Sequence, residues 1–106
     1  MKKLIEALQY MYQFLEYPDE DRTTSCEHDV FYVCDVNLKK MTAEDVHKLF
    51  ELGFVPGTDE DYRYVEEQLG HDFAISGDWS VITEEQWQNV REYLTGAMWS
   101  YVYGSC

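Results

Sequence analysis

Apolar side chains recur at helical spacing in four segments of this 106-residue chain. Such spacing gives a helix one apolar face that can pack on a core and one polar face for solvent. The pattern predicts helices over residues 2–16, 42–53, 58–70 and 83–95. The side chains expected to face inward are Leu4, Ile5, Leu8, Met11, Tyr12 and Leu15 in the first helix, Val46, Leu49 and Phe50 in the second, Tyr62, Val65 and Leu69 in the third, and Trp87, Val90 and Leu94 in the fourth.

Polar residues mark where three of these helices begin. Thr42 with Asp45, and Thr83 with Gln86, have the spacing of a capping box, in which each side chain accepts a hydrogen bond from the backbone of the other residue. Thr58 is expected to cap the third helix. The residues expected to flank the last capping box as a hydrophobic staple are Ile82 and Trp87, and the expected helix stops are Pro18, Gly53, Gly70 and Gly96.

Two runs rich in β-branched and aromatic residues predict paired strands. The run 28–36 is apolar on both faces, which indicates a central strand. The run 97–103 alternates aromatic residues with smaller ones and is expected to pair with the strand around Phe31. The polar stretch 19–27 is predicted to be a loop, and residues 56–57 a turn.

A shorter pair of runs, 73–76 and 79–82, indicates a hairpin. Gly77 and Asp78 lie between these runs, and a glycine in the first position suits a tight turn. The elements together predict one α+β domain over residues 1–106, with a small, mainly antiparallel sheet of three or four strands and helices packed on one side.

The charge of the chain indicates which class of partner it could bind. There are 21 Asp and Glu against 8 Lys and Arg, for a formal net charge of −13. Residues 49–106 hold only Arg63 and Arg91 against 11 acidic side chains. A negative potential of this size repels nucleic acid and anionic membranes and attracts basic surfaces. The sequence therefore argues against direct binding of nucleic acid or membrane.

The remaining composition indicates a folded protein of the cytoplasm. The chain has 17 aromatic residues, counted as 3 Trp, 9 Tyr and 5 Phe, which separates it from disordered acidic chains. An odd set of three cysteines fits free thiols better than a disulfide framework. The first residues do not have the pattern of a signal peptide, and no run approaches the roughly 18 apolar residues that a bilayer requires.

Cysteine and histidine residues offer the only metal-like pattern. Cys26, His28 and Cys34 could supply three ligands for zinc, but the candidates for a fourth lie far away in the sequence, and chance proximity is the favoured interpretation. A catalytic cysteine is not expected, because a strongly negative protein tends to raise thiol pKa values. The spacing of an EF-hand calcium loop and a glycine-rich phosphate loop are both missing. We therefore expect no enzyme site and no cofactor.

Carboxylates recur at seven-residue spacing in the second half. Glu60 with Glu67 and Glu85 with Glu92 are each expected to lie two helical turns apart, about 10.5 Å, on one face, as are the residues of the pair 59 and 66. A solvated face that aids solubility is the simple explanation. Exposed tyrosines, which are favoured at protein interfaces, point instead to a contact surface. The expected contact residues are Asp59, Glu60, Asp61, Glu66, Glu67, Glu84, Glu85, Glu92, Tyr62 and Tyr64.

In size and charge the whole chain resembles small acidic proteins of phages and mobile elements that block restriction enzymes or CRISPR effectors by imitating DNA. The resemblance implies a non-enzymatic inhibitor that occupies a basic nucleic-acid-binding site on a partner protein or nuclease. Two alternatives remain at this point. One is a host interaction module that uses its Tyr- and Trp-rich face, and the other is a small metalloprotein that uses Cys26, His28 and Cys34. DNA should compete with partner capture only if the chain imitates nucleic acid.

Overall fold

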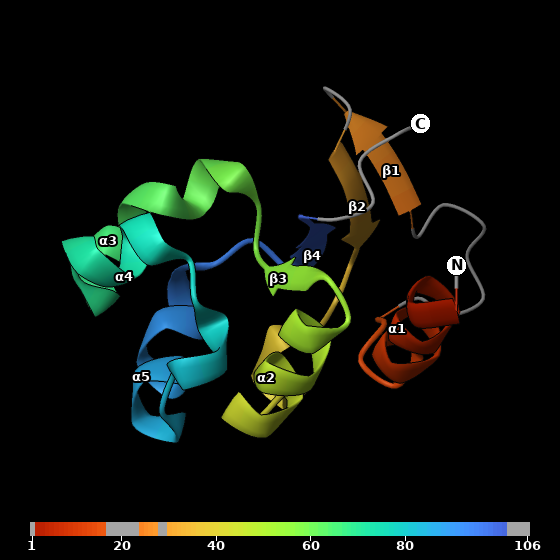
Figure 1. The fold of residues 1–106 in the computed structure, drawn as a ribbon, viewed down its shortest axis with the longest axis horizontal. Helices are drawn as coiled ribbons and strands as arrows, with labels where there is room; N and C mark the ends of the chain where they lie inside the picture. Colours follow the sequence, from red (N-terminus) through yellow and green to blue (C-terminus); the bar gives the residue numbers. More distant parts are fainter. Residues whose placement is uncertain (1, 17–23, 28–29, 102–106) are drawn as a thin grey trace.

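The computed structural model describes residues 2–16, 24–27 and 30–101 and has an α+β fold (Figure 1). The helices are α1 (Lys2–Tyr12), α2 (Ala43–Glu51), α3 (Tyr62–Leu69), α4 (His71–Ser76) and α5 (Glu84–Val90). Short 3₁₀ helices are η1 (Leu38–Lys40), η2 (Asp59–Asp61), η3 (Trp79–Val81) and η4 (Arg91–Tyr93). The strands are β1 (Thr24–Glu27), β2 (Val30–Cys34), β3 (Phe54–Pro56) and β4 (Ala97–Ser100). The predicted fold class is confirmed.

The described strands form one antiparallel sheet in the order β1-β2-β4-β3. The central position predicted for the run 28–36 is confirmed, because β2 lies between β1 and β4. The predicted partner is also confirmed, since Tyr32 pairs with Trp99. On its other side Trp99 pairs with Val55 of β3. The β4 strand therefore connects the long hairpin of β1 and β2 to the helical half of the molecule.

Two strands were not predicted. Residues 24–27 belong to a stretch predicted as a loop, yet they form β1, whose register places Thr24 opposite Val33. The residues before Gly57 form β3 rather than the start of a turn, and the chain bends only at Gly57, where φ is +84°. Neither segment has a strong strand pattern of its own, so each depends on the strand beside it for its hydrogen bonds.

The two predicted capping boxes are confirmed. The Thr42 hydroxyl accepts from the backbone N–H of Asp45 at 3.3 Å, and the Asp45 carboxylate accepts from the N–H of Thr42 at 2.8 Å. Thr83 and Gln86 make the same exchange at 3.1 and 3.0 Å. Thr58 does not cap α3 with its side chain, because η2 intervenes and Asp61 occupies the cap position. Residues 42 and 83 thus fix the starts of α2 and α5.

The hairpin predicted over 73–76 and 79–82 is wrong. The first run lies in α4 and the second in η3. Gly77 has a left-handed φ of 62° and caps α4 with an N–H bond to the carbonyl of Phe73, so the glycine ends a helix instead of forming a strand turn. The Phe73 ring packs edge-on against Trp79 with centroids 5.2 Å apart. Tertiary packing of these aromatic rings outweighs their strand propensity.

Helix ends also differ from the sequence pattern. The α1 helix ends at Tyr12, not at residue 16, and Phe14 is buried in the turn that follows. Ile5 and Tyr12, which were expected to face inward, are 51% and 55% exposed, while Ala7 is fully buried. The helix predicted over 83–95 changes to 3₁₀ geometry at residue 91. Pro18, the helix stop, lies outside the described residues, as do parts of the predicted runs 19–27, 28–36 and 97–103.

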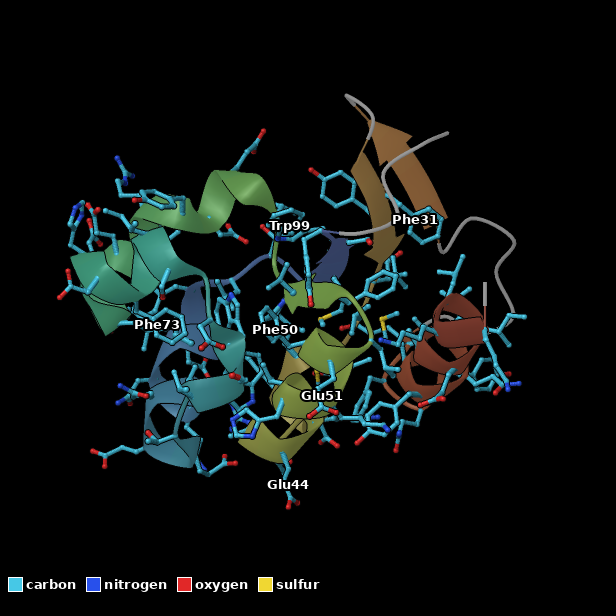
Figure 2. All side chains as sticks on the ribbon, viewed as in Figure 1. Phe31, Glu44, Phe50, Glu51, Phe73 and Trp99 are labelled. Carbon is cyan, nitrogen blue, oxygen red and sulfur yellow. The ribbon has the colours of Figure 1, made fainter. Side chains whose placement is uncertain are left out.

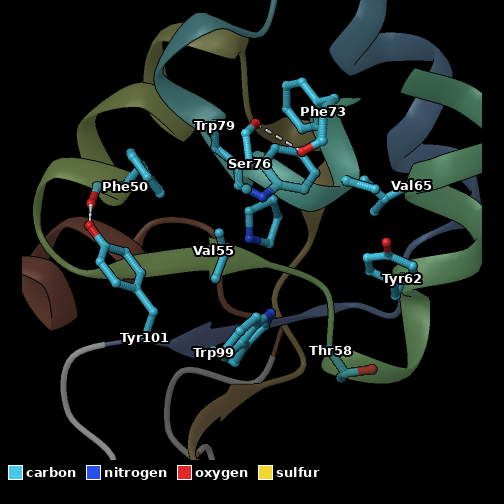
Figure 3. A pocket seen from close by; sticks show the side chains of 13 residues that line it. Phe50, Val55, Thr58, Tyr62, Val65, Phe73, Ser76, Trp79, Trp99 and Tyr101 are labelled. Carbon is cyan, nitrogen blue, oxygen red and sulfur yellow. Dashed lines mark hydrogen bonds between the residues drawn. The ribbon is translucent and has the colours of Figure 1, made fainter. Parts of the chain in front are cut away.

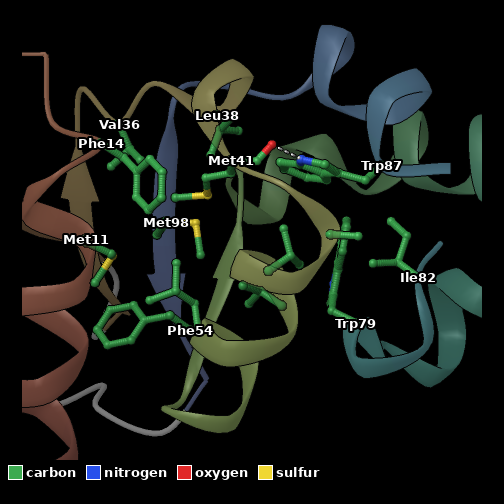
Figure 4. Close-up of a cluster of buried hydrophobic side chains, with 14 of the residues drawn as sticks. Met11, Phe14, Val36, Leu38, Met41, Phe54, Trp79, Ile82, Trp87 and Met98 are labelled. Atoms are coloured by element: carbon green, nitrogen blue, oxygen red, sulfur yellow. Dashed lines mark hydrogen bonds between the residues drawn. The ribbon is translucent and has the colours of Figure 1, made fainter. Parts of the chain in front are cut away.

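Buried side chains from both halves of the chain form one cluster (Figure 4). Trp87 is fully buried, and its indole N–H donates to the carbonyl oxygen of Met41 at 2.8 Å. Trp79 packs edge-on against Trp87 with centroids 6.4 Å apart. The cluster continues through Met98 of β4 to Met11 of α1. Every helix among the described residues is too short or too polar to cross a lipid bilayer.

Candidate functional site

Carboxylates are concentrated in the segment that forms one end of the molecule. Residues 59–92 carry ten Asp and Glu side chains against Arg63 and Arg91. This segment contains α3, α4 and α5, which lie together at the left of Figure 1, opposite α1, β1 and β2. We call this part of the protein the acidic end. The acidic charge that the sequence concentrates in the second half of the chain thus lies largely in one region of the fold.

The seven-residue carboxylate pairs are not each contained in one α-helix as predicted. Glu60 lies in η2 and Glu67 in α3, while Glu85 lies in α5 and Glu92 in η4. A 3₁₀ helix has three residues per turn and a rise near 2.0 Å, so the two-turn spacing of an α-helix does not apply across these junctions. The prediction that each pair lies on one α-helix is therefore wrong. Residue 59 also lies in η2, and its side chain is outside the described part.

Another pair fits the spacing rule within a single helix. Glu44 and Glu51 lie at the two ends of α2 and are exposed (Figure 2). Neither residue belongs to the expected contact set, since both lie outside residues 59–92. Their positions show that exposed carboxylates extend beyond the acidic end onto α2. The α2 pair also provides a matched surface for control substitutions.

Few carboxylates are neutralised by neighbouring cations. Of the 15 acidic residues whose side chains are described, two pair with a lysine and a third contacts a histidine within that part of the chain. The lysine pairs are Lys39–Glu92 at 3.4 Å and Lys48–Glu6 at 3.3 Å, and Nδ1 of His71 lies 2.7 Å from the Glu66 carboxylate. Glu60, Glu67 and Glu85 are exposed and have no cationic partner among the described residues. Most of the described carboxylates thus have no cationic partner within that part of the chain.

The two arginines of the acidic end do little to neutralise it. Arg91 donates from Nη1 to the carbonyl oxygens of Lys39 and Met41, each at 3.1 Å. Arg63 lies with its guanidinium carbon 5.7 Å from the centre of the Tyr64 ring. Neither makes an ion pair with a carboxylate that the structure describes. Arg91 therefore serves the fold, and Arg63 is held against an aromatic ring.

Glu84 is exposed but has a defined orientation. It accepts hydrogen bonds from the backbone N–H of Ala43 and from the Gln88 side chain, both at 2.8 Å. The bond from Ala43 is the main cause that holds the pKa of the Glu84 carboxyl below its ordinary value, followed by the bond from Gln88. This carboxylate therefore stays ionised and also ties α5 to the start of α2.

Asp61 must be removed from the expected contact residues. It is 5% exposed, and its carboxylate accepts hydrogen bonds from the backbone N–H groups of Thr58 and Thr95 at 3.0 and 2.9 Å. The Thr95 hydroxyl donates a third bond at 3.2 Å. A carboxylate with these buried partners cannot contact another protein without disrupting the fold. Asp61 is a structural residue.

The two tyrosines of the expected contact set differ in exposure. Tyr62 is 47% exposed. Tyr64 is partly buried and stacks on Tyr93 with ring centroids 6.0 Å apart. Tyr62 therefore offers more free surface to a partner, whereas the Tyr64 ring also joins α3 to η4.

An aromatic groove lies beside the acidic end. Its cavity volume is about 540 Å³, and Figure 3 shows the side chains around it, which come from residues 50 to 101. The groove is lined by Phe50, Val55, Pro56, Thr58, Tyr62, Val65, Phe73, Ala74, Ser76, Gly77, Trp79, Trp99 and Tyr101. The sequence pattern predicts a Tyr- and Trp-rich face but not this groove, because the groove depends on α4 and η3, where the pattern predicts a hairpin.

Tyr101 holds one side of the groove in place. Its hydroxyl donates to the carbonyl oxygen of Phe50 at 2.5 Å, and the two rings lie with centroids 5.1 Å apart (Figure 3). Its backbone N–H donates to Gly53 at 3.1 Å. Tyr62 lies across the groove on α3. The groove is therefore bounded by two tyrosines that are each about half exposed, at 49% and 47%.

The proposed zinc ligands are not brought together by the described backbone. Cys26 of β1 is opposite Phe31, three residues along β2 from Cys34, which corresponds to roughly 10 Å. His28 lies outside the described residues. Within the described part, no group of three or more His, Cys, Asp and Glu side chains could hold a metal ion.

Comparison of the chain with protein-family models, with curated proteins and with solved structures found no match. The functional argument therefore depends on the acidic end and the aromatic groove alone.

Proposed function

We propose that this chain is a non-enzymatic cytoplasmic protein that occupies a basic, nucleic-acid-binding site on a partner protein. Its carboxylates take the place of the phosphates of the nucleic acid. In this respect it resembles the phage and mobile-element proteins that inhibit restriction enzymes or CRISPR effectors. The observation that supports the proposal best is that residues 59–92 hold ten carboxylates against two arginines, and that few of the described carboxylates in this segment have a cationic partner.

Proteins that bind nucleic acid do so mainly through Lys and Arg side chains that contact phosphates. A partner built in this way has a positive site that attracts the acidic end over long range. Association should then be fast, and it should weaken as salt is added, because salt screens exposed charges. Nearby like charges also destabilise this protein slightly when it is free, and a basic partner relieves that repulsion.

The contact residues are those of the expected set whose described side chains are exposed or partly buried. The proposed carboxylates are Glu60, Glu66, Glu67, Glu84, Glu85 and Glu92, with Tyr62 and Tyr64 beside them. Glu66 and Glu92 must exchange their present partners, His71 and Lys39, for cations of the partner. Exposed pairs of this kind contribute about 0–1 kcal/mol, so the exchange costs little.

The proposal is tested by capture of a partner from lysate with two matched variants. One carries Glu60→Gln, Glu66→Gln and Glu67→Gln on the acidic end. The control carries Glu16→Gln, Glu44→Gln and Glu51→Gln at exposed positions elsewhere and removes the same charge. We expect both variants to fold and only the first to lose capture of a DNA-binding protein or nuclease. Equal capture by all three proteins would contradict the role of α3 as the contact.

A further inference from the structure

The aromatic groove has the size and chemistry of a ligand site. Its volume of about 540 Å³ lies within the range of roughly 300–1,000 Å³ that is typical of such sites. Its inner wall includes Val55, Val65 and Trp79, which are 5%, 9% and 5% exposed. Six of its lining residues are aromatic. A ligand that enters this groove must therefore present an apolar group.

Two hydrogen-bond donors of the groove are unused within the described residues. The indole N–H of Trp87 donates to Met41 in the core, but those of Trp79 and Trp99, which line the groove, have no acceptor among the described residues. Indole N–H groups can only donate, so their natural partners are carbonyl or other acceptor oxygens. A peptide supplies backbone carbonyls next to an apolar side chain. This combination favours a peptide over a simple apolar molecule.

The charge around the groove selects the kind of peptide. The described residues that line the groove include no Lys, Arg, Asp or Glu, so the charge near it comes from the neighbouring elements. Residues 58–81, which form η2, α3, α4 and η3, carry seven carboxylates against Arg63. Tyr62 connects the groove to these carboxylates, since it lines the groove and lies between Glu60 and Glu66 in the sequence. Charge complementarity therefore favours a basic segment.

We propose that the aromatic groove binds a lysine- or arginine-rich segment of the partner protein by taking an apolar or aromatic anchor side chain from it. The flanking cations of the segment pair with carboxylates of η2, α3 and α4. The Trp79 and Trp99 indoles donate to its backbone carbonyls. This inference rests on the proposed function for the basic character of the partner. The anchor side chain adds specificity to a contact that charge alone would make unselective.

The test is NMR titration of the ¹⁵N-labelled full chain with three capped synthetic hexapeptides. The first is Lys-Lys-Phe-Leu-Lys-Lys, the second replaces Phe-Leu with Ala-Ala, and the third replaces the four lysines with glutamine. The chain has three tryptophans, so the indole N–H signals can be assigned with Trp79→Phe and Trp99→Phe. Trp87, which is fully buried, serves as the internal control.

We expect the first peptide to move the indole signals of Trp79 and Trp99 and to leave that of Trp87 in place. The alanine and glutamine peptides should each bind about tenfold more weakly. If the lysine peptides move only backbone signals of the acidic end, whatever their anchor, the groove inference is overturned while the proposed function stands. Equal binding of the glutamine peptide overturns the basic segment, and no binding by any peptide overturns the site.

Two tyrosine variants test the groove without relying on its tryptophans. Tyr62→Ala removes a rim residue that is 47% exposed, and Tyr12→Ala removes a residue of similar exposure, 55%, on α1. We expect the Tyr62 variant to bind the first peptide about tenfold more weakly and the Tyr12 variant to bind it like the parent. Circular dichroism checks that both variants fold. An equal effect of the two substitutions would contradict the proposal.

Discussion

The carboxylate of Asp61 accepts a hydrogen bond from the backbone N–H of Thr95 at 2.9 Å, across 34 positions of the sequence. It also accepts from the N–H of Thr58 at 3.0 Å, so one side chain joins the start of α3 to the segment before β4. These bonds explain why an acidic residue of a strongly negative chain is buried. They also hold together two parts of the chain that line or flank the aromatic groove.

Removal of Asp61 should destabilise the fold. Asp61→Ala leaves the N–H groups of residues 58 and 95 without their acceptor, and we expect the free energy of unfolding to fall by about 2–4 kcal/mol. Glu60→Ala, at an exposed position next to it, should change the value by less than about 0.5 kcal/mol. Urea denaturation measures both. Similar losses in the two variants would show that Asp61 has no special structural role.

The same carboxylate leaves no room for a side chain at Gly57. A Cβ atom added at Gly57 would lie 2.7 Å from Oδ2 of Asp61, and φ there is +84°. Gly77 has a left-handed φ of +62°, but an added Cβ would meet nothing within 4 Å. We expect Gly77→Ala to cost about 1–2 kcal/mol from backbone strain alone. Gly57→Ala should lower the free energy of unfolding by at least about 1 kcal/mol more than Gly77→Ala, because Asp61 must also move.

Thermal denaturation of the two glycine variants provides the comparison. If the contact with Asp61 is the cause, the additional cost of Gly57→Ala should shrink in an Asp61→Ala background, where the clashing oxygen is gone. An additional cost that persists there would assign the effect to the backbone conformation of Gly57 and not to the carboxylate.

Tyr10 should make the stability of the protein depend on alkaline pH. Its hydroxyl donates to Asp45 at 2.5 Å. Burial, followed by this hydrogen bond and the charge of Asp45, raises the pKa of Tyr10 from 10.0 to about 12. A pKa that is raised in the folded state means that the protonated form is favoured by folding. The stabilisation is fully present below pH 10 and is lost as the pH rises from 10 to 12.

Tyr10→Phe isolates this contribution from the titration of other groups. We expect the parent to lose more unfolding free energy between pH 9 and 12 than the variant does, when both are measured by urea denaturation. The variant should be the less stable protein at pH 8, because it lacks the bond to Asp45. Parallel pH profiles for the two proteins would contradict the assigned pKa.

The local signals in the sequence were sufficient for part of the fold. Thr42 and Thr83 cap helices through neighbours three residues away, so their capping boxes could be recognised without a structure. The β1 strand could not, because residues 24–27 have a strand partner only once β2 is placed beside them. Phe73 and Trp79 misled the prediction, since their strand propensity is outweighed by their mutual edge-on packing in the fold.

The candidate site was harder to predict than the fold. The concentration of charge in residues 59–92 is visible in composition, but the burial of Asp61 requires the approach of Thr95 from another segment. The aromatic groove draws its lining from residues 50 to 101, and its shape depends on α4 and η3, which the sequence pattern presented as strands. Long-range packing therefore determines the burial of Asp61 and the shape of the groove, which local sequence patterns could not predict.

Competition with DNA tests the central claim most directly. The partner captured by the parent protein is purified, and its complex with this chain is titrated with double-stranded DNA at fixed ionic strength while the bound fraction is measured. If carboxylates occupy the nucleic-acid site, DNA and this protein should exclude each other, and a partner saturated with DNA should bind none of the chain. A ternary complex that contains all three components would contradict the account.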